Sequence, residues 1–395
     1  MSVMVPWRRK GELPEKGKVR SRDVLGDQQR RRKLRVLVGV LLVTTLLCTG
    51  VAIALIMQDG CTKNDVLWSQ SGASLIWAAG GEYLLQVGAN MEVWGFQGRK
   101  YVLESEAQQA VLTSHGVIVS DGFHVVLETP SGREQLLSIA QGGFLVAKAF
   151  DDCIYVANPT GGGLYGEPWH VVAATISGET EWQVTVPAVP VTVEQLGTRA
   201  LIAATDVATG GEACLYCIDT ESGRRLWSEN LGLGMWRGLV LNGETVISVL
   251  DNRVKGLSSS DGKALWTLEP PGPIVSAANV GGSVVLAWDS PWKPPVDRLV
   301  SSGVMLLADD GIVRWRKGVA GRHLRVLPRD KLPWEESSGR GVAVLWENNV
   351  MCYRAEDGQE VLKARTQGLP LDFDGSSTVL IKEGNDLRLV SVHER

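Results

Sequence analysis

The sequence is poor in cysteine and in charge. Its 395 residues include only six cysteines, too few and too scattered to hold a domain of this size together with disulfides. Charged residues make up 21% of the chain, and it contains 45 glycines, a balance that suits short strands joined by tight turns better than long surface helices. We therefore expect an all-β fold that rests on its apolar core.

Positive charge is concentrated at the start of the chain and scarce elsewhere. Residues 1–35 hold twelve Lys/Arg and four Asp/Glu, giving +8, and residues 36–57 hold no charge. Since the whole chain carries −4, residues 58–395 carry −4 − 8 = −12. An acidic body of this kind lacks the clustered Lys/Arg that neutralise phosphates, so no nucleic-acid partner is expected.

Signatures of catalysis and of metal binding are also missing. The five histidines show no metal-type spacing, and the chain has no Gly-x-Ser-x-Gly turn and no phosphate loop. Cys214 and Cys217 form a Cys-x-x-Cys pair, but in an alternating segment residues three apart point to opposite faces of a strand. We interpret the pair as strand packing. Four aspartates are interpreted as turn residues rather than metal ligands: Asp206, Asp251, Asp289 and Asp309.

Residues 36–57 are an uncharged apolar run of 22 residues that predicts one transmembrane helix. At 1.5 Å per residue such a helix is about 33 Å long, which matches a hydrocarbon core of about 30 Å. The basic stretch Arg30–Arg35 directly before the run places the N-terminus in the cytoplasm and the remainder outside it. The alternative is a cleaved signal peptide with a site near Ala52-Ile-Ala54, but the run is longer than such a peptide needs.

The membrane segment sets the predicted division of the chain. Residues 1–35 form a basic cytoplasmic tail with no apolar periodicity, predicted to be disordered. Residues 36–57 are the signal anchor, residues 58–65 a linker, and residues 66–395 the extracytoplasmic domain. Neither Cys48 nor Cys61 has the small residues that precede a lipid-acceptor cysteine. The predicted protein is thus a single-pass cell-membrane protein in contact with the lipid bilayer through residues 36–57.

A short element recurs along the outer domain: a glycine turn followed four residues later by a large apolar side chain. We call this element the tag. Its glycines are spaced by 34 to 49 residues, around the 40 to 50 of a four-stranded propeller blade. The glycine supplies the positive φ of a hairpin turn, and the next strand places the large side chain between neighbouring sheets. The tag glycines are Gly98, Gly132, Gly178, Gly223, Gly262, Gly311 and Gly358. The tag tryptophans are Trp182, Trp227, Trp266 and Trp315.

The segment Leu215–Trp227, Leu-Tyr-Cys-Ile-Asp-Thr-Glu-Ser-Gly-Arg-Arg-Leu-Trp, resembles the repeat of the pyrroloquinoline-quinone-type (PQQ-like) propeller family. The resemblance covers about residues 66–395 and is clearest between 170 and 320. Within the family the chain is distantly similar to the propeller lipoproteins of the outer-membrane β-barrel assembly machinery. The resemblance implies four-stranded antiparallel blades. Active quinoprotein dehydrogenases of the family often carry an adjacent Cys-Cys pair, which this chain lacks, so PQQ and calcium are not expected.

Ring closure indicates how many blades the domain has. After the seventh tag only three strands remain, and a propeller needs its last sheet completed by the first strand. The segment Val66–Gln70 contains Trp68 and reads like a tag strand without its turn. We therefore predict that it pairs with Asp386–Val392 and that the ring has eight blades. Seven blades is the alternative, because the 34-residue spacing leaves the first blades uncertain.

Three loops that join second to third strands are enlarged and should emerge on one face of the ring. They are Pro159–Pro168, Val207–Ala213 and Ser290–Ser302, and the insert Pro328–Arg340 with Trp334 should emerge on the opposite face. Aromatic and basic side chains of this kind are common at contact hot spots. Folding of the aromatics back onto their own loops is the competing interpretation. The candidate partner contacts are Tyr165, Trp169, Trp292, Lys293 and Arg298.

A scaffold without a visible reaction centre favours binding over catalysis, although fold does not fix function. The leading hypothesis is a noncatalytic scaffold that binds a protein or peptide in the cell envelope. A membrane-tethered sensor of a ligand or wall component is the second hypothesis. A PQQ-dependent dehydrogenase is the third and the least favoured.

Overall fold

The computed structural model describes residues 66–79, 81–104, 107–146, 153–161, 167–289, 302–321, 323–329, 340–374 and 377–392. The chain divides into two units, Met1–Cys61 and Thr62–Arg395, and every described residue belongs to the second. In these residues the regular elements are all strands, and none of them forms a helix long and apolar enough to cross a membrane. The predicted tail, transmembrane span and linker lie outside the described residues.

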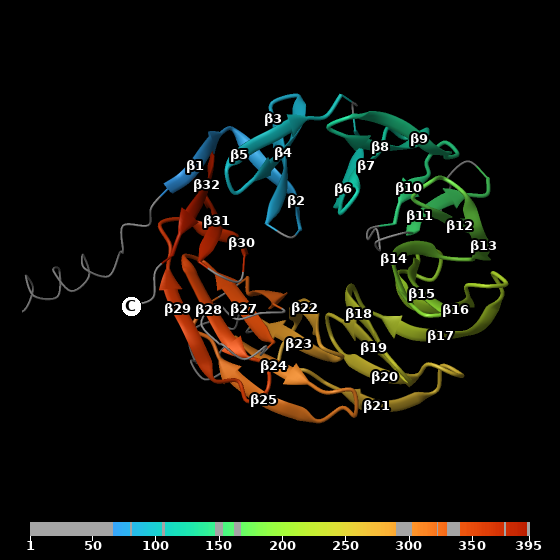
Figure 1. The fold of residues 1–395 in the computed structure, drawn as a ribbon. Coiled ribbons are helices and arrows are strands. Elements are labelled where there is room, and N and C mark those ends of the chain that lie inside the picture. Colours follow the sequence, from blue (N-terminus) through green and yellow to red (C-terminus); the bar gives the residue numbers. More distant parts are fainter. Residues whose placement is uncertain are drawn as a thin grey trace, which may run out of the picture. The chain divides into compact units, whose positions relative to one another are not determined.

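The strands form eight four-stranded antiparallel sheets arranged as a ring (Figure 1). Blade 1 contains β2 (Ala73–Ala79), β3 (Glu82–Val87), β4 (Asn90–Gly95) and β5 (Gly98–Val102). Blade 2 contains β6 (Gln109–Thr113), β7 (Gly116–Ser120), β8 (His124–Thr129) and β9 (Gly132–Ser138). Blade 3 contains β10 (Phe144–Leu145), β11 (Cys153–Pro159), β12 (Trp169–Thr175) and β13 (Thr180–Val186). Blade 4 contains β14 (Val189–Leu196), β15 (Arg199–Asp206), β16 (Glu212–Asp219) and β17 (Arg225–Leu233).

The second half of the ring repeats the same order of strands. Blade 5 contains β18 (Trp236–Asn242), β19 (Thr245–Leu250), β20 (Val254–Ser258) and β21 (Ala264–Leu268). Blade 6 contains β22 (Ile274–Val280), β23 (Ser283–Trp288), β24 (Gly303–Leu307) and β25 (Val313–Gly318). Blade 7 contains β26 (Arg325–Arg329), β27 (Gly341–Trp346), β28 (Asn349–Arg354) and β29 (Glu360–Arg365). Blade 8 contains β30 (Leu369–Phe373), β31 (Thr378–Glu383), β32 (Asp386–Ser391) and β1 (Val66–Ser71). The prediction of eight blades is confirmed, and the seven-bladed alternative is wrong.

The ring is closed by pairing between the two ends of the domain. Strand β1 runs antiparallel to β32, with Val66 opposite Val390 and Ser71 opposite Asp386. The Ser71 hydroxyl donates to Asp386 Oδ1 at 2.7 Å. The predicted closure is therefore confirmed, and the edge of β32 is covered by a strand from the other end of the domain.

The core lies between the blades. Eight clusters of buried apolar side chains among the described residues fill the eight junctions between neighbouring sheets. At the closing junction, Trp68 packs against Trp94 with ring centroids 4.9 Å apart and against Tyr83 at 6.1 Å. Because each strand side chain alternates between faces, one sheet contributes to the junctions on both of its sides.

Each tag joins the third strand of a blade to its outermost strand, as predicted. The tag tryptophan then packs on the turn of the next blade, and its indole N–H donates to a backbone carbonyl just before that turn. Trp227 donates to Ser259 at 2.9 Å, Trp266 to Asp309 at 2.8 Å and Trp315 to Ala355 at 2.8 Å. Trp68 makes the same bond across the closing junction, to Gly95 at 3.0 Å.

Trp182 departs from this pattern. It is buried and its ring lies 5.8 Å from that of Tyr155, but its Nε1 has no hydrogen-bond partner in the part of the chain that the structure describes. The junction between blades 3 and 4 therefore has the apolar contact of the tag without its hydrogen bond.

The antiparallel order gives the ring two distinct faces. One face carries the tag turns and the hairpins between first and second strands, and we name it the tag face. The loop face carries the hairpins between second and third strands and the connections between blades. Strand β1 begins at the tag face, because Val66 lies opposite Val390 near the end of β32.

Candidate functional site

Four of the predicted contact residues, Tyr165, Trp292, Lys293 and Arg298, lie outside the described residues. The fifth, Trp169, begins β12 and is buried, with its ring 5.3 Å from that of Phe144 at the junction of blades 3 and 4. The structure therefore places the Trp169 ring in the core between blades 3 and 4.

The strand order shows which face each predicted loop joins. Strands β11, β15 and β23 end at the loop face, where β12, β16 and β24 begin. Strand β26 ends at the tag face, where β27 begins. Of the three enlarged loops, only 207–211 is described throughout.

A groove opens on the loop face beside this loop. Its volume is about 630 Å³. Its most exposed apolar side chains are Leu233, the last residue of β17, and Met235, in the connection to β18; they are 59% and 61% exposed. We name it the loop-face groove, lined by Val191, Thr205, Gly210, Gly211, Leu233, Gly234, Met235, Trp236, Asp251 and Asn252.

Hydrogen bonds hold the backbone under these exposed side chains. The Met235 amide donates to Asp251 Oδ1 at 3.0 Å, and the Asp251 amide donates to the Met235 carbonyl at 2.9 Å. The Leu233 carbonyl accepts from Asn252 Nδ2 at 3.1 Å and from Arg253 Nη2 at 3.3 Å. The apolar side chains are thus presented to solvent on a fixed backbone, an arrangement that lowers the entropy cost of binding.

The loop on the other side of the groove is held by its own aspartate. Asp206 Oδ1 accepts from the Ala208 amide at 2.9 Å, and the Asp206 carbonyl accepts from the Gly211 amide at 2.9 Å. Gly211 has φ +98°, a conformation that favours glycine. The turn role predicted for Asp206 is confirmed by these bonds.

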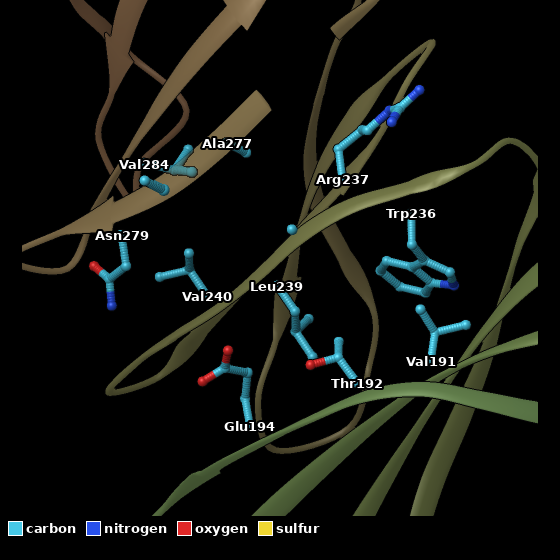
Figure 2. Close-up of a pocket in the computed structure, with 12 residues that line it drawn as sticks. Val191, Thr192, Glu194, Trp236, Arg237, Leu239, Val240, Ala277, Asn279 and Val284 are labelled. Carbon is cyan, nitrogen blue, oxygen red and sulfur yellow. The ribbon is translucent and has the colours of Figure 1, made fainter. Parts of the chain in front are cut away.

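A second, smaller depression adjoins the groove on the inner strands β14, β18 and β22 (Figure 2). We name it the inner-strand pocket; its volume is about 290 Å³. Val191 and Trp236 line both cavities, and the Trp236 indole is fixed by a bond from Nε1 to the Ala204 carbonyl at 2.9 Å. The polar side chains of the pocket are Thr192, Glu194, Arg237 and Asn279.

The Cys-x-x-Cys pair is part of the packing, as predicted. Cys217 is buried between blades 4 and 5, whereas Cys214 packs toward blade 3 from the opposite face of β16. Burial raises the pKa of Cys217 and of Cys153 to about 11, and it also raises the pKa of Cys214. These thiols are protonated at neutral pH and are therefore poor nucleophiles.

The other aspartates singled out in the sequence also have protein partners. Asp289 Oδ2 accepts from the His323 amide at 3.1 Å, and Asp309 Oδ2 accepts from Asn242 Nδ2 at 3.2 Å. Within the described ranges, no group of three or more His, Cys, Asp or Glu side chains lies close enough to hold a metal ion.

The ring and its tags define a β-propeller with PQQ-like repeats. A family profile described as outer membrane protein assembly factor BamB matches residues 170–326, which is the stretch where the tags are clearest. The predicted resemblance is thereby confirmed. No curated protein matches the chain.

Solved structures of low sequence identity are similar to this chain, and two of them, with TM-scores above 0.5, share its fold. Sqt1 of Saccharomyces cerevisiae has a TM-score of 0.55 at 12% identity, covering 84% of this chain and 100% of its own. Quinohemoprotein alcohol dehydrogenase from Comamonas testosteroni has a TM-score of 0.53 at 10% identity, covering 85% and 78%. BamB from Moraxella catarrhalis has a TM-score of 0.40 at 12% identity, covering 72% and 96%.

The sequence pointed to one side of the groove and missed the other. The loop 207–211 stood out because it is long and glycine-rich. Leu233, Met235 and Trp236 did not, because they lie at the junction of β17 and β18, where the sequence does not show that one strand ends and the next begins. The signal that could have found them is the two large apolar residues that flank Gly234 where one blade ends and the next begins, a place where polar residues are ordinary.

Proposed function

We propose that the protein is a membrane-anchored scaffold that binds a protein or peptide outside the cytoplasm, in the cell envelope. The observation that carries the proposal is the loop-face groove, where Leu233 and Met235 are exposed on a hydrogen-bonded backbone. Exposed apolar side chains grouped beside a groove and surrounded by polar groups are typical of protein contact sites. No residue is proposed to be catalytic, and neither PQQ nor calcium is proposed as a cofactor.

A sensor that binds a small ligand is the second candidate function. The inner-strand pocket favours it, because that pocket combines apolar walls with four polar side chains within about 290 Å³. Pockets for small molecules have this mixed character.

The proposed topology predicts how the protein behaves toward protease. We expect a full-length chain in membranes whose C-terminus is cut by external protease in spheroplasts, because the +8 tail and the apolar run favour a retained anchor. Detection of a C-terminal tag measures this. Protection of the tag, or a mature N-terminus between Ile53 and Gln58, would contradict the proposal.

Substitution in the groove tests the proposed contact site. Replacing Leu233 and Met235 together by serine should lower the affinity for the partner recovered by crosslinking at least tenfold. Burial of an apolar side chain of this size contributes about 1.5–3 kcal/mol, and about 1.4 kcal/mol corresponds to tenfold in affinity. Thermal stability should be unchanged, because both side chains are exposed in the unbound protein.

A matched control lies on the outermost strands of the same two blades. Leu226 and Leu265 are 48% and 57% exposed there, and neither lines the groove. Replacing both by serine should leave the affinity unchanged. Equal losses of affinity in the two double variants would indicate nonspecific adhesion and would show that the groove is not the contact site.

A further inference from the structure

Arg237 in the inner-strand pocket has no partner among the described residues. Its Nε is buried without a hydrogen bond, and its guanidinium makes no ion pair there. Other arginines on the strands of the ring do have partners: Arg199 donates to Ser259 Oγ at 2.9 Å and Arg325 to the Leu371 carbonyl at 2.8 Å. Arg388 also has an unbonded Nε, but its terminal nitrogens pair with carboxylates.

A donor that is buried without an acceptor costs free energy, and more when the group is charged. At Arg237 only the Nε is buried in this way, so the terminal nitrogens of the guanidinium remain open to a ligand. A carboxylate is the acceptor that best matches a guanidinium, because the two planar groups can form paired hydrogen bonds. The pocket therefore supplies a guanidinium that could bind the carboxylate of a ligand.

The other residues that line the pocket indicate that the rest of the ligand is apolar. Val240 on β18 and Ala277 on β22 provide apolar walls on the Arg237 side of the β18 ribbon, whereas Val191 and Leu239 lie on its other side (Figure 2). In that view the Arg237 side chain and the Glu194 carboxylate lie on opposite sides of the β18 ribbon. A ligand can thus place its carboxylate at Arg237 without bringing it to Glu194.

The size of the pocket limits the ligand. Its volume of about 290 Å³ lies at the lower end of small-molecule sites, which begin at about 300 Å³. We propose that the inner-strand pocket binds a small carboxylate with an apolar side chain through Arg237. This site adjoins the contact site proposed on Leu233 and Met235 and shares Val191 and Trp236 with it, but binding there needs no protein partner.

The test compares an acid with its neutral analogue. In titrations monitored by ligand-observed NMR, the full-length protein in nanodiscs should bind N-acetyl-L-leucine at least tenfold more tightly than N-acetyl-L-leucinamide. The Arg237→Gln variant should lose that preference, and the Arg224→Gln variant should keep it, since Arg224 is exposed in a tag turn. Equal binding of acid and amide, no saturable binding, or an unchanged preference in Arg237→Gln would overturn the proposal.

Two further arms complete the test. If Arg237→Gln melts below the parent, Arg237→Lys replaces it, because lysine keeps the charge without the planar guanidinium. This variant should retain a reduced preference for the acid, and a preference equal to that of the parent would overturn the role of the guanidinium.

The peptide acetyl-Gly-Gly-Leu, which also ends in a carboxylate, should bind at least tenfold more weakly than N-acetyl-L-leucine. Equal binding would assign the pocket to chain termini and overturn the small-molecule proposal. The effect of the Leu233/Met235 double substitution on partner affinity does not depend on these titrations. The protein-binding proposal and the small-carboxylate proposal can therefore be contradicted independently.

Discussion

Replacing Trp68 by alanine is expected to lower the free energy of unfolding by about 3–5 kcal/mol, the usual cost of removing a buried tryptophan. The loss is large because this side chain completes the ring: it packs on Tyr83 and Trp94 of blade 1 and donates to the Gly95 carbonyl. Deleting residues 61–71 while keeping the anchor should cost at least as much, since it also exposes the edge of β32. Chemical denaturation monitored by circular dichroism measures both effects.

Leu67 provides the control for this prediction. It is the neighbouring residue on the same strand but is 40% exposed, so Leu67→Ala should cost less than about 1 kcal/mol. A Trp68→Ala protein as stable as the Leu67→Ala protein would show that β1 is dispensable and that the ring does not depend on closure.

Replacing Gly262 by alanine is expected to destabilise the protein by about 2–4 kcal/mol, through two separate effects. Gly262 has φ +75°, where a side chain is strained, and a Cβ added there would lie 2.6 Å from Cε3 of Trp227. The indole cannot move away freely, because its Nε1 is bonded to the Ser259 carbonyl. Thermal denaturation should therefore show a clear loss in the melting temperature.

Gly197 separates the two effects. It has φ +57°, but an added Cβ would meet no atom within 4 Å, so Gly197→Ala should show the backbone strain alone, about 1–2 kcal/mol. If both glycine variants lose the same stability, the tag tryptophan does not lock the turn of the next blade, and the explanation of the repeat is wrong.

The sequence was sufficient for the architecture because each blade carries the same local signal. A tag glycine and a large apolar residue four positions later recur in seven of the eight blades, so their spacing indicates the number of blades. Closure followed from a physical requirement, because a three-stranded last blade would leave unpaired backbone groups. Trp68 then stood out as a tag residue without a turn, and the structure places it in the predicted role.

The candidate site was less predictable because it arises from contacts between segments that are distant in sequence. The loop-face groove requires Val191, Gly211, Met235 and Asp251 from four different segments to meet, and no local pattern encodes that meeting. For Trp169, the sequence alone could not decide whether the ring faces solvent or core, since the packing of Phe144 from another strand decides it. The unpaired state of Arg237 likewise becomes visible only when its surroundings are known.

The central claim, that the loop face of a membrane-anchored propeller binds a protein, is tested most directly by photo-crosslinking in intact cells. A photoreactive amino acid placed at position 235 contacts molecules bound at the groove, and one placed at position 226 contacts molecules at the outermost strand of blade 4. The account predicts one defined crosslinked protein from position 235, diminished by Leu233→Ser, and none from position 226. Crosslinks of equal yield from both positions, or none from position 235, would contradict it.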